Sequence, residues 1–178
     1  MAALMARQLV GDMGVVLVRK LRAPLMPEVA VGAINENGRV YLNHDAPRMG
    51  ADTAYLEQEK AVQLATLRQR RRMYSAIRQP PDMAGRTVIV VDDGLATGAT
   101  MIAALASVRQ QHPSRLVCAV PVASAEALVA IRPLANDVVC LSVPEDFEGV
   151  GQFYRDFAQV TDDEVIKCLQ ASSKRDTS

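Results

Sequence analysis

The chain has 178 residues, of which 49% are hydrophobic, and its 20 basic and 20 acidic side chains give no formal net charge. This length and apolar content suit one domain with its own core and exclude a wholly disordered chain. The balanced charge excludes a general polyanion binder, and no apolar run approaches the roughly 20 residues of a membrane span. Three scattered cysteines and two histidines predict neither a disulfide framework nor a structural zinc site, and they favour a reducing, cytoplasmic compartment.

The first half of the chain predicts a helix, a buried strand, a β-hairpin and a long second helix. In chain order, these elements are expected at residues 2–10, 15–18, 29–42 and about 52–77. The apolar run Val15–Val18 is typical of a parallel strand that is covered on both faces, and Asn35–Gly38 indicates the turn of the hairpin. On the long helix, one side is expected to carry Tyr55, Val62 and Met73, and the opposite side Arg68, Arg71 and Arg72.

The second half of the chain alternates strands and helices. Strands are expected at residues 87–91, 116–120 and 138–143, and helices after residue 100, at 125–131 and at 162–171. In the first of these helices, Met101, Leu105 and Val108 have the spacing of core residues. Alternating elements of this kind predict an α/β fold with a mostly parallel sheet flanked by helices, into which the hairpin is inserted. We expect residues 1–171 to form a single domain and residues 172–178 a polar tail.

Two acidic residues and a loop of small residues follow the strand at 87–91. Asp92 and Asp93 come at the carboxyl end of that strand, where open α/β sheets bind ligands. The small side chains of the loop at 94–100 let backbone N–H groups approach an anion closely, and the following helix directs its positive end to the same place. Adjacent acids at a buried strand end are costly unless something binds there. The pattern predicts a site for a phosphate beside a hydroxyl-rich group or a divalent cation.

This segment resembles the phosphoribosyl pyrophosphate motif of the type I phosphoribosyltransferases, which consists of a hydrophobic strand, two acids and a small-residue phosphate loop. The resemblance extends from the first residue to about Leu169 and points to a bacterial branch of that family. It implies that Asp92 and Asp93 hold the ribose hydroxyls and that residues from about 21 to 50, with a C-terminal segment, form a small hood. It also implies that Gly94 binds the substrate and that the 5′-phosphate is bound by the loop residues Ala96, Thr97, Gly98, Ala99 and Thr100.

Two further groups of residues gain a role from the same resemblance. Arg19 and Lys20 resemble the loop of the family that faces the pyrophosphate, and two cations at a strand end suit the charge of a leaving group. A solvated strand end is the alternative. Phe147, Phe153 and Tyr154 belong to the segment that closes over the base in the family, so they are candidate stacking residues. Simple core packing explains these aromatic residues equally well.

The chain departs from the family pattern in two places. Ala96 stands where enzymes of the hypoxanthine and guanine type carry an aspartate, which weakens that assignment and leaves adenine-like, orotate-like or other acceptors open. The N-terminal strand and its Arg-Gly-Gly pyrophosphate loop are not found, because Met1-Ala-Ala-Leu already belongs to a helix. We therefore expect an exposed sheet edge, weak or no transferase activity and an increased tendency to associate. A start codon assigned too far downstream, a shortened chain and a divergent relative are competing explanations.

The resemblance implies an enzyme, a glycosyltransferase of the phosphoribosyltransferase type. It would bind phosphoribosyl pyrophosphate with Mg²⁺, held mainly by the substrate with help from Asp92 and Asp93, and transfer phosphoribosyl to a nitrogenous base of unknown identity. The expected protein is a cytoplasmic homo-oligomer without a membrane or nucleic-acid partner. Two alternatives stay open, an interaction subunit and a non-catalytic regulator that senses phosphoribosyl pyrophosphate. In the regulator, Arg68, Arg70, Arg71 and Arg72 would contact nucleic acid, although a solvated helix face is the simpler explanation.

Overall fold

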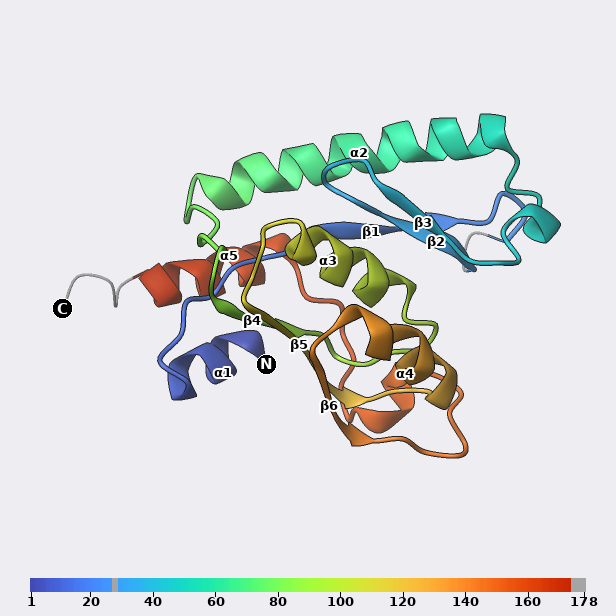
Figure 1. The fold of residues 1–178 in the computed structure, drawn as a ribbon. Helices are drawn as coiled ribbons and strands as arrows, with labels where there is room; N and C mark the ends of the chain where they lie inside the picture. The colour runs from blue at the N-terminus through green and yellow to red at the C-terminus, as the bar shows by residue number, and fades with distance from the viewer. Residues whose placement is uncertain (27–28, 174–178) are drawn as a thin grey trace.

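The structure is a computed structural model that describes residues 1–26 and 29–173. In chain order its elements are α1 (Ala2–Gln8), β1 (Val18–Arg22), β2 (Ala30–Asn35), β3 (Val40–Leu42), α2 (Thr53–Ser75), β4 (Thr87–Val91), α3 (Ala99–Arg109), β5 (Arg115–Val122), α4 (Ala125–Ile131), β6 (Asp137–Ser142) and α5 (Asp162–Ser173). Short 3-10 turns lie at Pro47–Met49, Arg132–Leu134 and Val150–Phe153. Helix α2 covers one small sheet, and α3 lies between that sheet and a second one (Figure 1).

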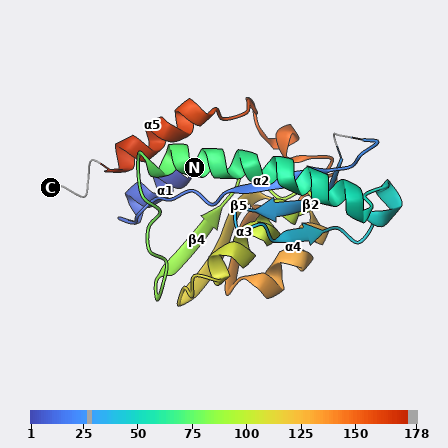
Figure 2. The ribbon, with the colours of Figure 1, turned by 90° about the horizontal axis from the view of Figure 1, so that it is seen from above.

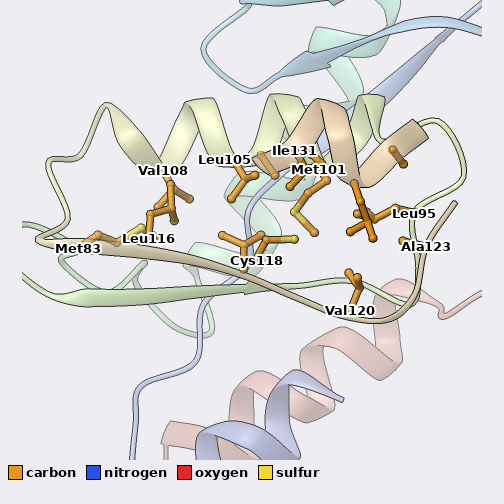
Figure 3. Packing of buried hydrophobic residues seen from close by; sticks show 14 residues of the cluster. Met83, Leu95, Met101, Leu105, Val108, Leu116, Cys118, Val120, Ala123 and Ile131 are labelled. Carbon is orange, nitrogen blue, oxygen red and sulfur yellow. The ribbon is translucent and has the colours of Figure 1, made fainter. Parts of the chain in front are cut away.

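The parallel sheet confirms the predicted α/β fold. Its strand order is β4-β5-β6, and the register places Val90 opposite Cys118. All five residues of β4, Thr87–Val91, are β-branched, and such side chains favour an extended, half-buried strand. Helices α3 and α4 cover one face of this sheet, while α1 and α5 lie on the other side (Figure 3). The predicted core residues of α3 are buried against the sheet, namely Met101, Leu105 and Val108.

The second sheet is antiparallel, with the strand order β1-β2-β3, and α2 runs across it (Figure 2). The prediction of a parallel strand at Val15–Val18 is therefore wrong. Val18 begins β1, which pairs antiparallel with β2, and the carbonyl of Val15 accepts a hydrogen bond from the Arg71 guanidinium at 2.9 Å. Leu17 is buried as expected, but the burial of a short apolar run does not reveal what its backbone pairs with.

The hairpin between β2 and β3 has the predicted turn at Asn35–Gly38. The Gly38 N–H donates to the Asn35 carbonyl at 3.0 Å. Gly38 has a φ of +82°, a left-handed conformation that glycine adopts without a steric penalty. The antiparallel unit nevertheless begins at Val18, inside the run that the sequence assigned to the parallel sheet.

Helix α2 forms where the sequence predicts it, but its buried side differs. The Asp52 side chain caps the helix by accepting from the Tyr55 N–H at 2.8 Å. The buried residues are Gln63, Leu67 and Tyr74, whereas Val62 is 59% exposed. Placing Val62 on the apolar side was therefore wrong.

The arginines of α2 also do not share one environment. Arg68 and Arg72 are exposed, as predicted. Arg71 is half-buried and forms an ion pair with Glu36 of the hairpin. Arg71 therefore ties α2 to the hairpin turn instead of facing solvent, and the expected solvated face holds only for part of the cluster.

In the described part of the chain, β4 is an edge strand of the parallel sheet. Its Ile89 is 36% exposed, and a largely apolar cavity of about 620 Å³ lies along this edge. Helix α1 borders the cavity and has no buried residue. The expectation of an exposed sheet edge with apolar neighbours is confirmed for these residues.

The C-terminal helix runs slightly beyond its expected end at 171, since α5 continues to Ser173. The rest of the predicted polar tail, residues 174–178, lies outside the described residues. None of the helices between residues 1 and 173 that the structure describes is both long and apolar enough to cross a membrane.

Candidate functional site

Asp92 and Asp93 lie directly after β4, at the carboxyl end of the parallel sheet. The Asp93 N–H donates to the Asp92 carboxylate at 3.0 Å. Burial, and next the charge of Asp93, raise the pKa of Asp92 to about 6, and burial also raises the pKa of Asp93. Both carboxylates are therefore less stable in their charged form than in water. A ligand that supplies hydroxyl donors or a cation would stabilise that charge.

The loop after the acids is held by the strand beside it. The Leu95 N–H donates to the Val122 carbonyl at 3.0 Å, and the Ser124 N–H donates to the Leu95 carbonyl at 2.9 Å. The Ser124 hydroxyl donates to the Ala96 carbonyl at 2.7 Å and accepts from the Ala127 N–H, which caps α4. Ser124 therefore fixes the loop and the start of α4 together.

The end of the loop is shaped to begin a helix. Gly98 has a φ of +77° and is the N-cap of α3, a conformation that side chains other than glycine rarely adopt. The Thr97 hydroxyl accepts from the Ala99 N–H at 3.4 Å. Ala96 and Thr97 are exposed, Thr100 is half-buried and Ala99 is buried. The first N–H groups of a helix have no partner within the helix, so the start of α3, next to the exposed Ala96 and Thr97, suits a phosphate.

The two predicted cations, Arg19 and Lys20, are adjacent residues of β1 and lie on opposite faces of it. Adjacent residues of a strand point to opposite faces. The charge of Lys20 acts on both acids, where it lowers their pKa against the larger effect of burial. The Arg19 guanidinium instead donates to the Gln63 side chain of α2 at 2.8 Å. Lys20 therefore joins the acid pair, whereas Arg19 lies on the side of the sheet that α2 covers.

Of the three predicted aromatic residues, Tyr154 contacts Asp93, whereas Phe147 and Phe153 contact each other. The Tyr154 hydroxyl donates to the Asp93 carbonyl at 2.7 Å. Phe147 and Phe153 stack on each other with ring centroids 5.7 Å apart. Phe153 is 40% exposed, so this pair offers a partly open apolar surface beside the site.

Three residues near the site were missed by reasoning from the sequence. Ser124 carries a recognisable signal, because it precedes a predicted helix as an N-cap would, but its bond to the loop depends on the fold. Val150 packs over Gly94, since a Cβ built on Gly94 would lie 2.8 Å from it. Phe157 lies 5.2 Å from Tyr154 between ring centroids, and no local pattern distinguishes it from a core residue.

Two cavities border the site. The larger one follows the free edge of β4 and reaches Asp92 and Thr100. The smaller one, of about 410 Å³, lies along β1 and is lined by Arg19, Lys20 and Thr100 among others. Because Thr100 lines both, the acids and the cations open to adjacent spaces at the start of α3.

The donor set at the acid pair fits a magnesium ion that is bound partly by a substrate. In the parts of the chain that the structure describes, no group of three or more His, Cys, Asp or Glu side chains is arranged to hold a metal. Asp92 and Asp93 supply carboxylate oxygens, the type of ligand that Mg²⁺ prefers. Mg²⁺ is commonly held by one or two carboxylates together with substrate phosphates, so two acids are enough.

Comparison with known proteins finds relatives that are named as putative phosphoribosyl transferases. The chain is 38% identical over 170 residues to the Mycobacterium tuberculosis proteins named "Putative phosphoribosyl transferase Rv0571c" and "MT0597"; the match covers 95% of this chain and 38% of each relative. The chain thus spans less than half the length of these curated relatives. The crystal structure of TT1426 from Thermus thermophilus is 48% identical, with a TM-score of 0.75 over 95% of this chain and 80% of that one.

The family model described as a phosphoribosyl transferase domain matches residues 1–158. That range includes the acid pair, the loop at 94–100, Lys20 and all three predicted aromatic residues. The chain therefore belongs to the phosphoribosyl transferase family.

Proposed function

We propose that the protein binds phosphoribosyl pyrophosphate and transfers its phosphoribosyl group to a nitrogenous base. The observation that supports this best is that one short loop, exposed at Ala96 and Thr97, joins two partly buried carboxylates to the start of α3. A ribose needs acceptors for its hydroxyls, and its 5′-phosphate needs N–H donors a few ångströms away. Family membership supports the same proposal.

In this proposal each group has a defined task. Asp92 and Asp93 accept hydrogen bonds from the ribose hydroxyls, and Thr97–Thr100 bind the 5′-phosphate through backbone N–H groups and hydroxyls. Lys20 neutralises part of the charge of the pyrophosphate. The stacked pair Phe147 and Phe153 offers an apolar surface for the planar base.

The reaction exchanges one bond for another at C1 of the ribose. A ring nitrogen of the base forms the new bond to C1, the bond from C1 to the pyrophosphate oxygen breaks, and the pyrophosphate leaves with the electron pair. The proton of the attacking nitrogen is lost to solvent or to the pyrophosphate. The side chain of Ala96 cannot take part in this proton transfer. Positioning and charge stabilisation would supply most of the rate. Residues 147–157, which we call the aromatic segment, would limit access of water.

Mg²⁺ fits the carboxylates of Asp92 and Asp93, and when bound it supplies charge stabilisation to the pyrophosphate. The residues described above retain their roles in binding and orientation. A cytoplasmic location, a homo-oligomeric state and a base acceptor belong to the same proposal. The edge of β4, with which no strand of the described residues pairs, supports self-association, because such an edge is a surface for pairing.

Isothermal titration with phosphoribosyl pyrophosphate and MgCl₂ tests the proposal. Asp92→Asn combined with Asp93→Asn is expected to weaken binding by about 100-fold, because hydrogen bonds to charged groups contribute about 1.5–3 kcal/mol each. The matched control is Asp163→Asn, which removes an exposed carboxylate at the start of α5 and should leave the affinity unchanged. Equal affinities of the double variant and the wild type would contradict the assignment.

A further inference from the structure

A groove along the free edge of β1 gathers four basic side chains. Its volume is about 410 Å³, and β1 is an outer strand of the antiparallel sheet. The lining residues come from β1, β2, α2 and α3 and from the residue before β2: Val18, Arg19, Lys20, Arg22, Val29, Ala30, Arg70 and Thr100. Among the residues that the structure describes, this lining contains no carboxylate and no aromatic ring. The groove therefore suits a small polyanion better than a stacked base or a nucleic acid.

The cations of the groove are only partly neutralised by the protein. Arg70 lies 3.1 Å from the Asp162 carboxylate of α5. Arg19 donates to the neutral side chain of Gln63. Within residues 1–26 and 29–173, neither Arg19, Lys20 nor Arg22 forms an ion pair with a carboxylate within 4.0 Å.

Arg70 and Arg22 also lie close enough to Arg19 for their charges to act on it. Burial lowers the pKa of Arg19 first, and the neighbouring charges of Arg70 and Arg22 lower it further, while Glu59 and Asp162 oppose the shift. Like charges held together in a partly buried groove are unfavourable unless an anion binds between them. Planar guanidinium groups bind phosphate oxygens in pairs.

The groove adjoins the proposed ribose site. Lys20 lines the groove and also acts on Asp92 and Asp93, and Thr100 lines the groove at the start of α3. We propose that Arg70, with Arg19 and Arg22, binds the pyrophosphate group of the substrate. This inference rests on the proposed function and adds a binding residue from α2, a helix on which the sequence suggested only a solvated face or a nucleic-acid contact.

A purely structural role for Arg70 is the alternative, since its ion pair connects α2 to α5. Tyr74, also on α2, donates a hydrogen bond to the same Asp162 carboxylate. Tyr74 itself is buried in the core that α2 shares with α5. The contact between the two helices therefore does not depend on Arg70 alone, so Arg70→Gln is expected to keep the fold.

The test uses titration calorimetry with two probes, inorganic pyrophosphate with MgCl₂ and ribose 5-phosphate. Arg70→Gln is expected to weaken pyrophosphate binding by about tenfold or more, because a charge-assisted contact is lost. It should leave the affinity for ribose 5-phosphate within about twofold, since that probe has no group in the groove. Arg72→Gln, an exposed neighbour on the same helix, is the matched control and should change neither affinity.

A second variant separates binding from structure. Asp162→Asn removes the ion pair but retains the Arg70 charge, so it should keep pyrophosphate binding within about threefold of the wild type if Arg70 contacts the ligand. If Asp162→Asn weakens pyrophosphate binding as much as Arg70→Gln, or if Arg70→Gln has no effect, the inference is wrong. Failure of the wild type to bind ribose 5-phosphate would instead contradict the proposed function and leave a separate pyrophosphate site in the groove.

Discussion

The two sheets contribute opposite charges to the candidate site, and they hold them in different ways. The parallel sheet holds Asp92 and Asp93 at the carboxyl end of β4, where burial raises the pKa of both. The antiparallel sheet holds Lys20 and Arg22 on exposed positions of an outer strand. Charged groups on an exposed edge cost little, whereas buried carboxylates destabilise the fold. The acid side of the site, at Asp92 and Asp93, therefore destabilises the folded protein, whereas the basic side, at Lys20 and Arg22, costs little.

The largest expected effect comes from disturbing the acid side at Gly94. A Cβ at this position would lie 2.8 Å from Val150 and 3.0 Å from Val122. Gly94→Ala is therefore expected to lower the free energy of unfolding by about 2–3 kcal/mol, as overpacked sites do. Urea denaturation measures this change. Gly11→Ala, whose Cβ meets nothing within 4 Å, is the control, and an equally small change in both variants would show that the aromatic segment does not press on the acid loop.

A smaller, pH-dependent effect is expected for Asp92→Asn. The pKa of Asp92 is about 6 in the folded protein against an ordinary value of 3.8, so the folded state holds its proton more tightly than the unfolded chain. The stability contributed by this group is therefore present at low pH and is lost as the pH rises from about 4 to about 6. The asparagine variant escapes this loss, so above about pH 7 it should be more stable than the wild type by about 2 kcal/mol.

Thermal or urea denaturation at several pH values measures the difference for Asp92→Asn. The gain should disappear near pH 4, where the wild-type carboxyl is largely protonated in the folded state. Asp163→Asn provides the baseline for an exposed acid of α5. A gain that stays constant over the whole pH range would mean that it does not come from the buried charge of Asp92.

On the basic side, Lys20→Gln is expected to reduce the affinity for phosphoribosyl pyrophosphate by about tenfold, which corresponds to about 1.4 kcal/mol. The same change removes a charge that lowers the pKa of Asp92 and Asp93. The pH below which binding is lost should therefore move upward, as titrations at several pH values would show. Lys167→Gln on α5 is a matched control. An unchanged pH profile would separate Lys20 from the acid pair.

The smallest effect is expected for Thr97→Val in the loop at 94–100. The Thr97 hydroxyl is exposed and accepts a long hydrogen bond from the Ala99 N–H. Its loss should weaken ribose 5-phosphate binding by about fivefold, in line with about 1 kcal/mol for one hydrogen bond. Thr66→Val on α2 should leave the affinity unchanged. A hundredfold loss for Thr97→Val would instead indicate that the loop itself had been rearranged.

The same contrast explains what the sequence could and could not predict. Strand β4 and helix α4 were placed at the observed residues, because β-branched runs and a serine cap act locally. Strand β1 was assigned to the wrong sheet, since a short apolar run does not reveal its pairing partner β2, and the Arg71 contact to Val15 is distant in sequence.

The residues of the candidate site also divide into those that the sequence could predict and those that it could not. The acid loop was predictable because one continuous segment carries it. Lys20 and Arg19 were predicted as a pair, but strand alternation sends one toward the acids and the other toward Gln63. The role that we propose for Arg70 depends on how α2 crosses β1, which no local pattern encodes. Residues that act across long sequence separations are therefore the part that required the structure.

A crystal structure of the protein with phosphoribosyl pyrophosphate and Mg²⁺ tests the central claim most directly. The account predicts that the ribose hydroxyls contact Asp92 and Asp93, that the 5′-phosphate lies at the N–H groups of residues 97–100, and that the pyrophosphate extends toward Lys20 and Arg70. A ligand bound in the cavity along β4, with both carboxylates uncontacted, would contradict it.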